Sequence, residues 1–468
     1  MTLIIVIILL LGYILIATSS ITRINKAASA MFAGTVGWVL YICWGTDYVM
    51  SQHPNEYIDW LAGANATSVA VKQYIAENIF LNYVGKGAEI VLFLLATMTI
   101  VEILNNNGCF DFLTQTMRTR NSRKLLWVIT AITFIISANL DNITTTTMML
   151  MIMHDIVPSR RQRMIYGSAI IIAANCGGAL TVIGDTTGLL LWTNSMVTAT
   201  DFSMTLMIPC LISWIVPTLW LSRMLPERID SQWRTMPYRG DDTNLSPWQR
   251  VVMLFVGIGG LWFIPTFHNI TKLSPFLGAL CVLSVLWVVN EAFNHKLMNA
   301  DQMSQRFIPR ALQYGSLQQI LFVMGIMLGM GVVTETGVFP DVARWMDDTI
   351  HNVWILGVVS GFLSAVVDTF TIAISDISLY PVVEAARLEQ AADAAYLSQF
   401  TRNGSYWMIV AYTTAVGGCL LSVGSVSGLA LMKIEHLRLG WYLRNLTLKV
   451  LAGWVVGLVV LWLEIYYV

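Results

Sequence analysis

The sequence predicts an all-α polytopic membrane protein built from two inverted repeats, each with a re-entrant helical hairpin and a discontinuous transmembrane helix. Three observations carry this prediction. Of the 468 residues, 56% are hydrophobic and 12% are charged, and the mean hydropathy is +0.65, well outside the range of soluble proteins. Apolar runs of membrane-spanning length recur along the chain. Two further long runs are each interrupted by an aspartate.

Ten apolar segments have about the ~20 residues that a helix needs to cross the hydrocarbon core of a bilayer. They lie at 2–20, 27–49, 85–104, 163–194, 203–222, 251–267, 273–293, 317–337, 405–432 and 446–467. The first segment has neither a basic region before it nor a small-residue cleavage site, so we interpret it as a retained helix rather than a signal peptide. The sequence thus predicts about ten full spans.

Two other segments, 125–156 and 353–380, are too long for one span and too short for two. Each is broken in the middle, at Asp141-Asn142 and at Asp368-Thr369. Arms of about 14–16 residues reach only ~21–24 Å at 1.5 Å per residue. The loops on both sides of the first segment are basic, which places both on the cytoplasmic side. We therefore expect two re-entrant hairpins whose tips stop inside the membrane.

The basic residues also predict the orientation. Most of the 27 Lys and Arg side chains fall in loops near 22–27, 105–124, 157–163, 222–250, 294–316 and 433–449. The positive-inside rule makes these loops cytoplasmic and puts both termini outside. The second hairpin is flanked by an acidic loop and enters from the outer face, so the two halves come out inverted. Drawn in this way, no Lys or Arg lies deep within a span.

A shared glycine frame supports two related halves. GGALTVIGDTTG at 177–188 and GGCLLSVGSVSG at 417–428 both read GG-x5-G-x3-G, and each follows a hairpin that carries SA-x-x-D. The glycines expected at the helix breaks are Gly177, Gly178, Gly184, Gly417, Gly418 and Gly424. Four parts follow: two N-terminal helices and an outer loop (1–84), the first repeat with broken helix 163–194 (85–224), a connecting loop and two linking helices (225–316), and the second, inverted repeat with broken helix 405–432 (317–468).

Carboxylates stand beside the predicted breaks at membrane depth. Broken helices expose backbone carbonyls, and aspartates add charge, so the tips form oxygen-rich pockets suited to a small cation or protons. The alternative is that Asp141 and Asp185 only cap helix arms, although asparagine would cap without the cost of a buried charge. We expect Na+ or Li+ at Asp141 and Asp185. The predicted cation- and proton-binding residues are Asp141, Asn142, Asn175, Thr181, Asp185, Thr186 and Asp368.

Three further acidic residues are candidates for a proton path. Glu89 and Glu102 stand 13 positions apart in AEIVLFLLATMTIVEIL, near the two ends of one predicted span. An interfacial role explains them as well as proton entry does. Asp376 lies eight residues beyond Asp368, and either an interfacial role or a part in the proton path would explain it.

The composition also weighs against other classes. The six cysteines include no CxxC pair, and the six histidines show no HxxxH or HExxH spacing, so neither a metal centre nor a membrane-embedded enzyme is favoured, and no cofactor is expected. The absence of deep Lys or Arg favours a cation over an anion as substrate. The rival within the same architecture is a sodium-coupled anion symporter that carries a dicarboxylate-like substrate.

At these residues the chain resembles the NhaD-type sodium/proton antiporters of the ion transporter superfamily. The matching pieces are AEIVLFLLATMTIVEIL (88–104), RKLLWVITAITFIISANLDNITTTT (123–147), AANCGGALTVIGDTT (173–187) and AYTTAVGGCLLSVGSVSG (411–428). The resemblance implies exchange of Na+ or Li+ for H+ across the bacterial inner membrane, in sodium export and pH homeostasis. It also implies a homodimer in the lipid bilayer, with no nucleic-acid partner. Thr369 stands where the family usually has asparagine.

The expected mechanism is competition for the aspartates. Burial favours the neutral, protonated carboxyl group, whereas a bound cation favours the ionised carboxylate, so each ligand displaces the other. Exchange then requires that one hairpin-bearing unit moves against the rest of the protein to give alternating access.

Overall fold

The computed structural model describes residues 2–467 with gaps at 23, 64, 118, 230–244, 295–309, 385–387 and 389–392. Helices dominate the described chain, which contains one isolated β-bridge, between Asn121 and Arg228. In this part of the chain, seven helices are long and apolar enough to cross a membrane: Lys26–Cys43, Ser68–Asn106, Ala199–Ser222, Pro247–Thr271, Pro275–Phe293, Leu317–Glu335 and Leu439–Tyr467. The predicted all-α polytopic membrane protein is confirmed. Parts of the predicted basic loops 222–250 and 294–316 lie outside the described residues.

The other three predicted spans differ from simple membrane helices. The first, α1 (Thr2–Ala17), has 16 residues. Segment 163–194 is divided into α11 (Arg160–Gly178) and α12 (Thr186–Thr193). Segment 405–432 is likewise divided into α24 (Ser405–Gly417) and α25 (Val426–Ile434). The breaks fall at residues 179–185 and 418–425, where the glycine frame predicts them.

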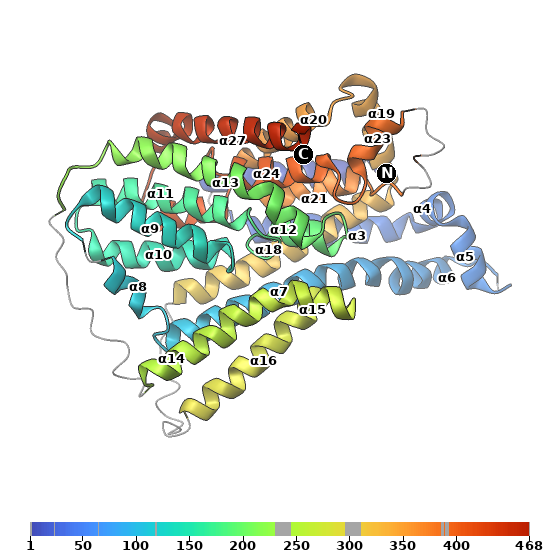
Figure 1. Ribbon diagram of the computed structural model, residues 1–468. Coiled ribbons are helices and arrows are strands. Elements are labelled where there is room, and N and C mark those ends of the chain that lie inside the picture. Colours follow the sequence, from blue (N-terminus) through green and yellow to red (C-terminus); the bar gives the residue numbers. More distant parts are fainter. Residues whose placement is uncertain are drawn as a thin grey trace.

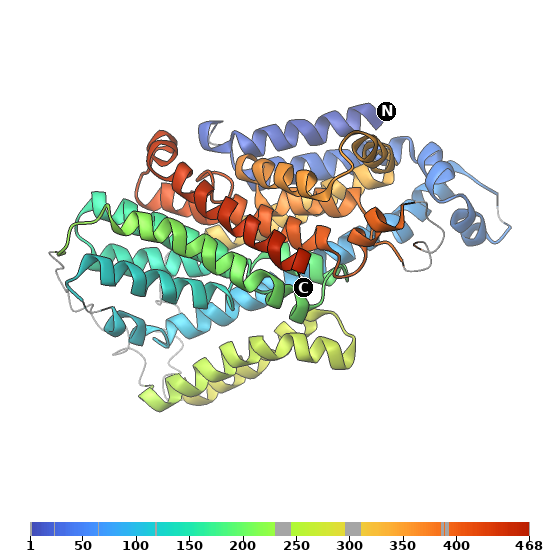
Figure 2. The ribbon, with the colours of Figure 1, turned by 45° about the horizontal axis from the view of Figure 1, so that its top comes forward.

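In the described residues, the N-terminal part supplies α1 and six further helices with one π-helical turn. They are α2 (Ser19–Thr22), α3 (Lys26–Cys43), α4 (Gly45–Gln52), α5 (Pro54–Leu61), α6 (Ser68–Tyr74), the π-turn Ile75–Phe80 and α7 (Leu81–Asn106). From the middle of the chain come α8 (Asp111–Thr116), α13 (Ala199–Ser222), α14 (Pro247–Leu254), the π-turn Phe255–Gly259, α15 (Gly260–Thr271) and α16 (Pro275–Asn294). Both views place α14 to α16 at one edge of the molecule (Figures 1 and 2).

The C-terminal part continues with α18 (Arg310–Glu335) and α19 (Val338–Thr349). Beyond the second hairpin lie α23 (Ala394–Leu397), the 3-10 turn Ser398–Phe400, α26 (Leu439–Tyr442), the π-turn Leu443–Thr447 and α27 (Leu448–Tyr467). Helix α27 packs along α13, as Figure 2 shows. An unpredicted feature is α19, which meets the first arm of the second hairpin at 120°.

Helices α3 and α18 pack together through small residues. A Cβ added to Gly34 would lie 2.7 Å from the carbonyl oxygen of Gly325, and one added to Gly325 would lie 2.6 Å from the backbone nitrogen of Met31. Glycines let membrane helices approach this closely because no side chain separates the backbones. Helices α1 and α7 also contact this pair, and together the four form a scaffold beside the hairpins.

Both predicted hairpins are present. The first consists of α9 (Ser122–Ser137) and α10 (Asn142–Ile156), and the second of α20 (Val353–Val366) and α21 (Thr369–Leu379). Their arms have 16, 15, 14 and 11 residues. At 1.5 Å per residue, each arm is about 16–24 Å long. That length is shorter than the ~30 Å hydrocarbon core, so no arm crosses a membrane alone.

The hairpins open toward opposite ends of α13. This 24-residue helix is about 36 Å long. Near its C-terminal end, the backbone N–H of Ile229 bonds to the carbonyl of Arg120, just before α9 begins. At its N-terminal end, the backbone N–H of Thr198 donates to the side chain of Asn403. Three residues before Asn403, the ring of Phe400 stacks on Tyr380, the residue after α21. Figure 1 shows α8 and the start of α9 on the side away from α19 and α23. The two-fold relation between whole repeats stays a prediction.

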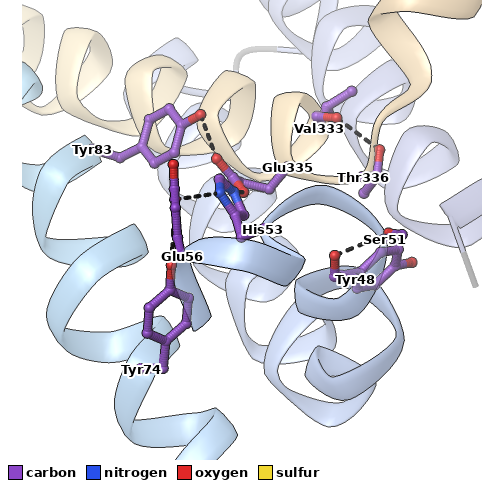
Figure 3. Close-up of polar contacts among 9 residues, drawn as sticks. All are labelled: Tyr48, Ser51, His53, Glu56, Tyr74, Tyr83, Val333, Glu335 and Thr336. Carbon is purple, nitrogen blue, oxygen red and sulfur yellow. Dashed lines mark hydrogen bonds and ion pairs between the residues drawn. The ribbon is translucent and has the colours of Figure 1, made fainter. Parts of the chain in front are cut away.

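A polar cluster ties the end of α18 to the N-terminal loop helices. The imidazole of His53 lies between two glutamates, with its Nε2 2.8 Å from Glu335 and its Nδ1 3.0 Å from Glu56 (Figure 3). The hydroxyl of Tyr83 donates a 2.8 Å hydrogen bond to Glu335, and that of Tyr74 donates to Glu56. The predicted outer loop of the N-terminal part is thereby attached to the scaffold.

The cluster predicts a pH-dependent stability. Burial alone would lower the pKa of His53, but the hydrogen bonds and charges of Glu335 and Glu56 outweigh it and raise the pKa above the ordinary 6.5. The stabilisation is therefore complete below the unfolded pKa and is lost as pH rises through the folded one. We expect His53→Gln to lower the melting temperature of the purified protein at pH ~5.5 more than at pH ~9. Exposed His154→Gln is the control. A larger loss at high pH than at low pH would contradict the assignment.

Candidate functional site

In both halves, the hairpin is joined to the broken helix by matching contacts. The hydroxyl of Ser137 in the first hairpin donates a 2.7 Å hydrogen bond to the carbonyl of Ala174 on α11. The hydroxyl of Ser364 in the second hairpin donates a 2.9 Å bond to the carbonyl of Thr414 on α24. Each serine begins the SA-x-x-D motif, and each carbonyl lies three residues before the first glycine of the shared frame. The two motifs therefore have corresponding places in space as well as in sequence.

The first glycine of each frame lies directly against its hairpin. A Cβ on Gly177 would come within 2.3 Å of the carbonyl oxygen of Phe134, and a Cβ on Gly417 within 2.7 Å of that of Gly361. Real Cβ atoms are not found this close to a backbone oxygen, so a side chain at either position would push the hairpin away. Phe134 and Gly361 each precede the motif serine by three residues, so this contact too is repeated.

The tip of the first hairpin is organised by Asp141. The carboxylate of Asp141 caps α10 by accepting the backbone N–H groups of Ile143 at 3.2 Å and Thr144 at 3.3 Å. Both bonds use the same oxygen, Oδ2. A carboxylate at this place also complements the positive end of the helix dipole.

Asp185 caps the second part of the broken helix in the same manner. Its Oδ1 accepts the backbone N–H of Thr186 at 2.8 Å and the hydroxyl of the same residue at 3.3 Å. The amide of Asn142 donates a 3.1 Å bond to this Oδ1 and another 3.1 Å bond to the side-chain oxygen of Asn175. Five of the seven predicted binding residues, from three elements, thus meet between the hairpin tip and the helix break: Asp141, Asn142, Asn175, Asp185 and Thr186.

The carboxylates of this first-half site have no basic partner among the described residues. Oδ1 of Asp141 is buried and has no hydrogen-bond partner among the described residues. Within the same described ranges, neither Asp141 nor Asp185 forms an ion pair with a Lys, Arg or His side chain. The charges of Asp141 and Asp368 both act on Asp185. Gln319 on α18 lies beside Asp141. An oxygen-rich, net-negative cluster of this kind can bind a small cation or protons.

The corresponding place in the second half is different, because a lysine lies there. Asp368 caps α21 by accepting the backbone N–H of Phe370 at 3.2 Å. The ammonium of Lys26, the first residue of α3, lies 3.7 Å from Oδ1 of Asp368. It donates to the carbonyls of Val367 at the hairpin tip, 3.3 Å away, and Val423 at the helix break, 3.0 Å away. Lys26 stands at the end of a span, in line with the expectation that no Lys or Arg lies deep within one, but its long side chain extends to the buried hairpin tip.

Polar contacts also join the two halves. The amide of Asn175 donates to the sulfur of Cys419 at 2.8 Å and to the hydroxyl of Ser425 at 3.3 Å. The hydroxyl of Ser427 donates a 3.4 Å bond to the backbone carbonyl of Asn142. Two residues of the first-half site, Asn175 and Asn142, are thus in direct contact with the second helix break and with α25 beyond it.

The other predicted residues lie in different surroundings. Thr181 donates its hydroxyl to the carbonyl of Ala138 and accepts the backbone N–H of Gly184, so it attaches the hairpin tip to the break. Glu89 accepts a 3.1 Å bond from Ser274, at the start of α16.

The remaining two acidic residues, Glu102 and Asp376, also lie apart from the first-half site. Glu102 lies on α7, partly buried. Asp376 is buried inside the second hairpin, where Ser360 donates to it at 2.9 Å. A direct part for these acidic residues in a proton path stays a prediction.

Several residues of the site were missed by sequence reasoning. Lys26 and Gln319 come from α3 and α18, far from either motif in the chain, and no local pattern marks them. Cys419 lies within the second glycine frame, but its partner Asn175 is 244 residues away. A search for polar residues inside the glycine frames could have identified Cys419, whereas only the fold identifies the two scaffold residues.

This chain is similar in sequence to several proteins that are named as transporters. The family model CitMHS, described as a citrate transporter, matches residues 1–398. Sodium/proton antiporter 1 of Arabidopsis thaliana is 30% identical over 85% of this chain, which spans 64% of that relative. Sodium/proton antiporter 2 of the same plant is 29% identical, covering 85% of this chain and 90% of the relative. The Na+/H+ antiporter NhaD of Vibrio cholerae is 25% identical, covering 96% and 89%.

Proposed function

Since the chain belongs to the citrate transporter family CitMHS, we propose that it is a secondary active antiporter that exchanges Na+ or Li+ for H+. The names of three relatives, sodium/proton antiporters 1 and 2 and NhaD, support this choice within the family. The resemblance to NhaD-type antiporters in the hairpin and helix-break motifs points the same way. The chain is a multi-pass membrane transporter, and the choice of ions and their coupling are the proposal.

The observation that carries the proposal is the pair of buried carboxylates at the first helix break. Asp141 and Asp185 are each 5% exposed, are linked through Asn142 and form no ion pair among the described residues. Two buried carboxylates without a basic partner are costly when both are ionised. Binding of a small cation, or of protons, removes that cost. The site therefore favours having one of these ligands at all times.

Alternation between the two ligands is the exchange mechanism. A proton that arrives at Asp141 or Asp185 removes a charge that the cation needs, and a bound cation makes protonation less favourable. Asn142, Asn175 and Thr186 hold the carboxylates and add oxygens to the cation's shell. Thr181 positions the hairpin tip against the break. Access from alternate faces then requires the hairpin and its broken helix to move relative to the scaffold.

The competing function is a sodium-coupled anion symporter, which the description of the family as citrate transporters favours. An anion would need positive charge near the breaks. Lys26 is the basic residue that the described chain places there, and Asp368 neutralises it. The unneutralised charge at the first break is negative and would repel a carboxylate substrate. The electrostatics of the site therefore favour the antiporter.

Transport by purified protein in liposomes separates the two functions. The vesicles contain a pH-sensitive dye and are given Na+, Li+, K+ or choline as chloride salts, and citrate or succinate with and without Na+. An antiporter moves protons in response to Na+ or Li+ alone, in the direction opposite to the cation. Uptake of radiolabelled citrate or succinate that requires Na+, with no proton movement by Na+ alone, would replace the proposal with the symporter.

We also propose that the protein works in the bacterial inner membrane as a homodimer, in sodium export and pH homeostasis, with both termini periplasmic. The basic loops support the orientation. Cysteines at Arg123 and Ser159, exposed at the two ends of the first hairpin, should react with a membrane-impermeant maleimide from the cytoplasm. Cysteines at Asp348 and Glu384, near the second hairpin, should react from the periplasm. The exposed native Cys43 and Cys281 are replaced by serine first. Labelling of all four positions from one side would contradict this topology.

The homodimer and the physiological role have their own tests. Cross-linking in native membranes should give a species of twice the monomer mass. A strain that lacks its own sodium exporters should grow at raised Na+ and alkaline pH when it produces this protein. Failure to restore growth, with active protein in the membrane, would separate the exchange activity from the proposed physiological role.

A further inference from the structure

The ammonium of Lys26 has the contacts of a bound cation. It lies among three oxygens of the second half: the carbonyls of Val367 and Val423 at 3.3 and 3.0 Å and the carboxylate of Asp368 at 3.7 Å. The side chain of Lys26 is 10% exposed and that of Asp368 is 1% exposed. Backbone carbonyls at a hairpin tip and a helix break, with one carboxylate, are also the oxygens that hold small cations in broken-helix transporters.

The glycine frame and the SA-x-x-D motif identify the first-half counterparts of the three oxygens around Lys26. Asp368 corresponds to Asp141, and the tip carbonyl of Val367 corresponds to that of Leu140. The break carbonyl of Val423 corresponds to that of Ile183. The matching contacts of the two serines and the two glycines place each hairpin against its broken helix in the same way, which supports these correspondences. Among the described residues, no basic side chain approaches Asp141 as Lys26 approaches Asp368.

The net charges of the two sites differ as well: the second-half site is neutral, whereas the first-half site is negative. The second half has one carboxylate, Asp368, with Ser425 where the first half has Asp185, and the lysine neutralises it. The first half has two carboxylates, and none of the described Lys, Arg or His side chains pairs with either. Oδ1 of Asp141 and Oδ1 of Asp368 are both buried without a hydrogen-bond partner among the described residues, but only that of Asp368 has an ammonium group beside it. One half therefore has its positive charge supplied by the chain, and the other must obtain it from solution.

We propose that Lys26 is a built-in cation that occupies the second-half site, so that the first-half site alone is open to an exchangeable Na+ or Li+. This inference rests on the proposed function, because an exchangeable cation matters only to a cation transporter. Its test measures Na+ binding and stability, and neither measurement requires transport. It assigns a function to a residue of α3, outside both hairpins, and it limits the protein to one transported cation in each cycle. Lys26 is thus a determinant of coupling stoichiometry.

Removal of the lysine should open a second site. Equilibrium binding of radioactive Na+ to purified Lys26→Ala should rise from about one to about two ions per chain. Adding Asp368→Asn should return the value to about one, because the second site then lacks its carboxylate. Lys26→Arg keeps a cation in place and should stay near the wild-type value. Lys72→Ala, at an exposed lysine of α6, is the matched control.

Stability gives a second readout. Loss of Lys26 leaves a buried, unpaired carboxylate, which is strongly destabilising. Na+ or Li+ should compensate for it, so the melting temperature of Lys26→Ala should rise with NaCl or LiCl far more than that of wild type, and choline chloride at equal ionic strength should not reproduce the rise. Binding that stays at the wild-type stoichiometry overturns the proposal. A variant that cannot be recovered folded even at saturating Na+ or Li+ overturns it as well.

The experiment distinguishes this inference from the proposed function. If wild type binds Na+ at Asp141 and Asp185 and Lys26→Ala gains nothing, the built-in cation is wrong and the antiporter stands. If wild type binds no Na+ while Lys26→Ala gains a site that Asp368→Asn removes, the built-in cation stands and the antiporter fails.

Discussion

Replacing Asp185 with asparagine is expected to abolish Na+-dependent proton movement, and Asp141→Asn is expected to do the same. Asparagine preserves the helix cap, because its side-chain oxygen accepts the same backbone N–H groups. It removes the charge that binds the cation and the group that binds the proton. Folding should therefore be maintained while both ligands are lost. The measurement is Na+-driven dye response in proteoliposomes, which should fall to the level of protein-free vesicles.

Asp155→Asn is the matched control, because Asp155 lies exposed near the end of the same helix, α10, that Asp141 caps. It should exchange at the wild-type rate. Each variant must elute from size-exclusion chromatography as wild type does, so that loss of exchange is not loss of fold. Exchange near the wild-type rate in either Asp141→Asn or Asp185→Asn would remove that aspartate from the mechanism and leave it as a helix cap.

The second large effect is expected on the apparent KM for Na+. If Na+ and H+ compete for Asp141 and Asp185, a fall in pH raises the proton occupancy of the site and so raises the KM. The maximal rate at saturating Na+ should change comparatively little. Where the site is mostly protonated, the KM should rise by about tenfold per pH unit for each proton displaced. Initial rates over a grid of Na+ concentrations at pH ~6.5 to ~9 measure this.

A different pattern would assign the proton elsewhere. If the pH dependence were confined to the maximal rate, with a constant KM, Na+ and H+ would use separate sites. Asp368, Asp376 or Glu102 would then be better proton carriers, and Asp141 and Asp185 would keep only the cation. The same initial-rate measurements with Asp376→Asn are informative, because Asp376 is buried in the second hairpin and lies apart from the first-half site.

Some features of the fold follow from local sequence. Apolar runs of about 20 residues predict membrane helices because unpaired backbone groups and charges are too costly in hydrocarbon. Aspartates at 141, 185 and 368 each cap a helix, as an aspartate between two apolar segments indicates. The glycines of the repeated frame lie where the broken helices meet the hairpins. These features depend on interactions between residues close in the chain, or on a motif that occurs twice.

Part of the candidate site could also be predicted from the sequence. Asp141, Asn142, Asn175, Asp185 and Thr186 are polar residues within apolar segments, and the structure brings them together. Thr181 is polar in the same way, but it joins the hairpin tip to the break. A polar residue at membrane depth must either bind a ligand or satisfy the backbone of a broken helix. Thr181 does the latter, and binding by the other five stays a prediction.

What the sequence by itself determined is the class of protein, the two hairpins, the two helix breaks and the acidic residues beside them. The tertiary structure alone decided that Lys26 neutralises Asp368, that Asn175 joins Cys419, and that His53 joins Glu335. These pairs are separated by 342, 244 and 282 positions. Contacts over such separations depend on how helices pack, and a lysine at a helix end looks interfacial until the hairpin tip beside it is placed. For that physical reason, the asymmetry between the two halves is a property of the fold.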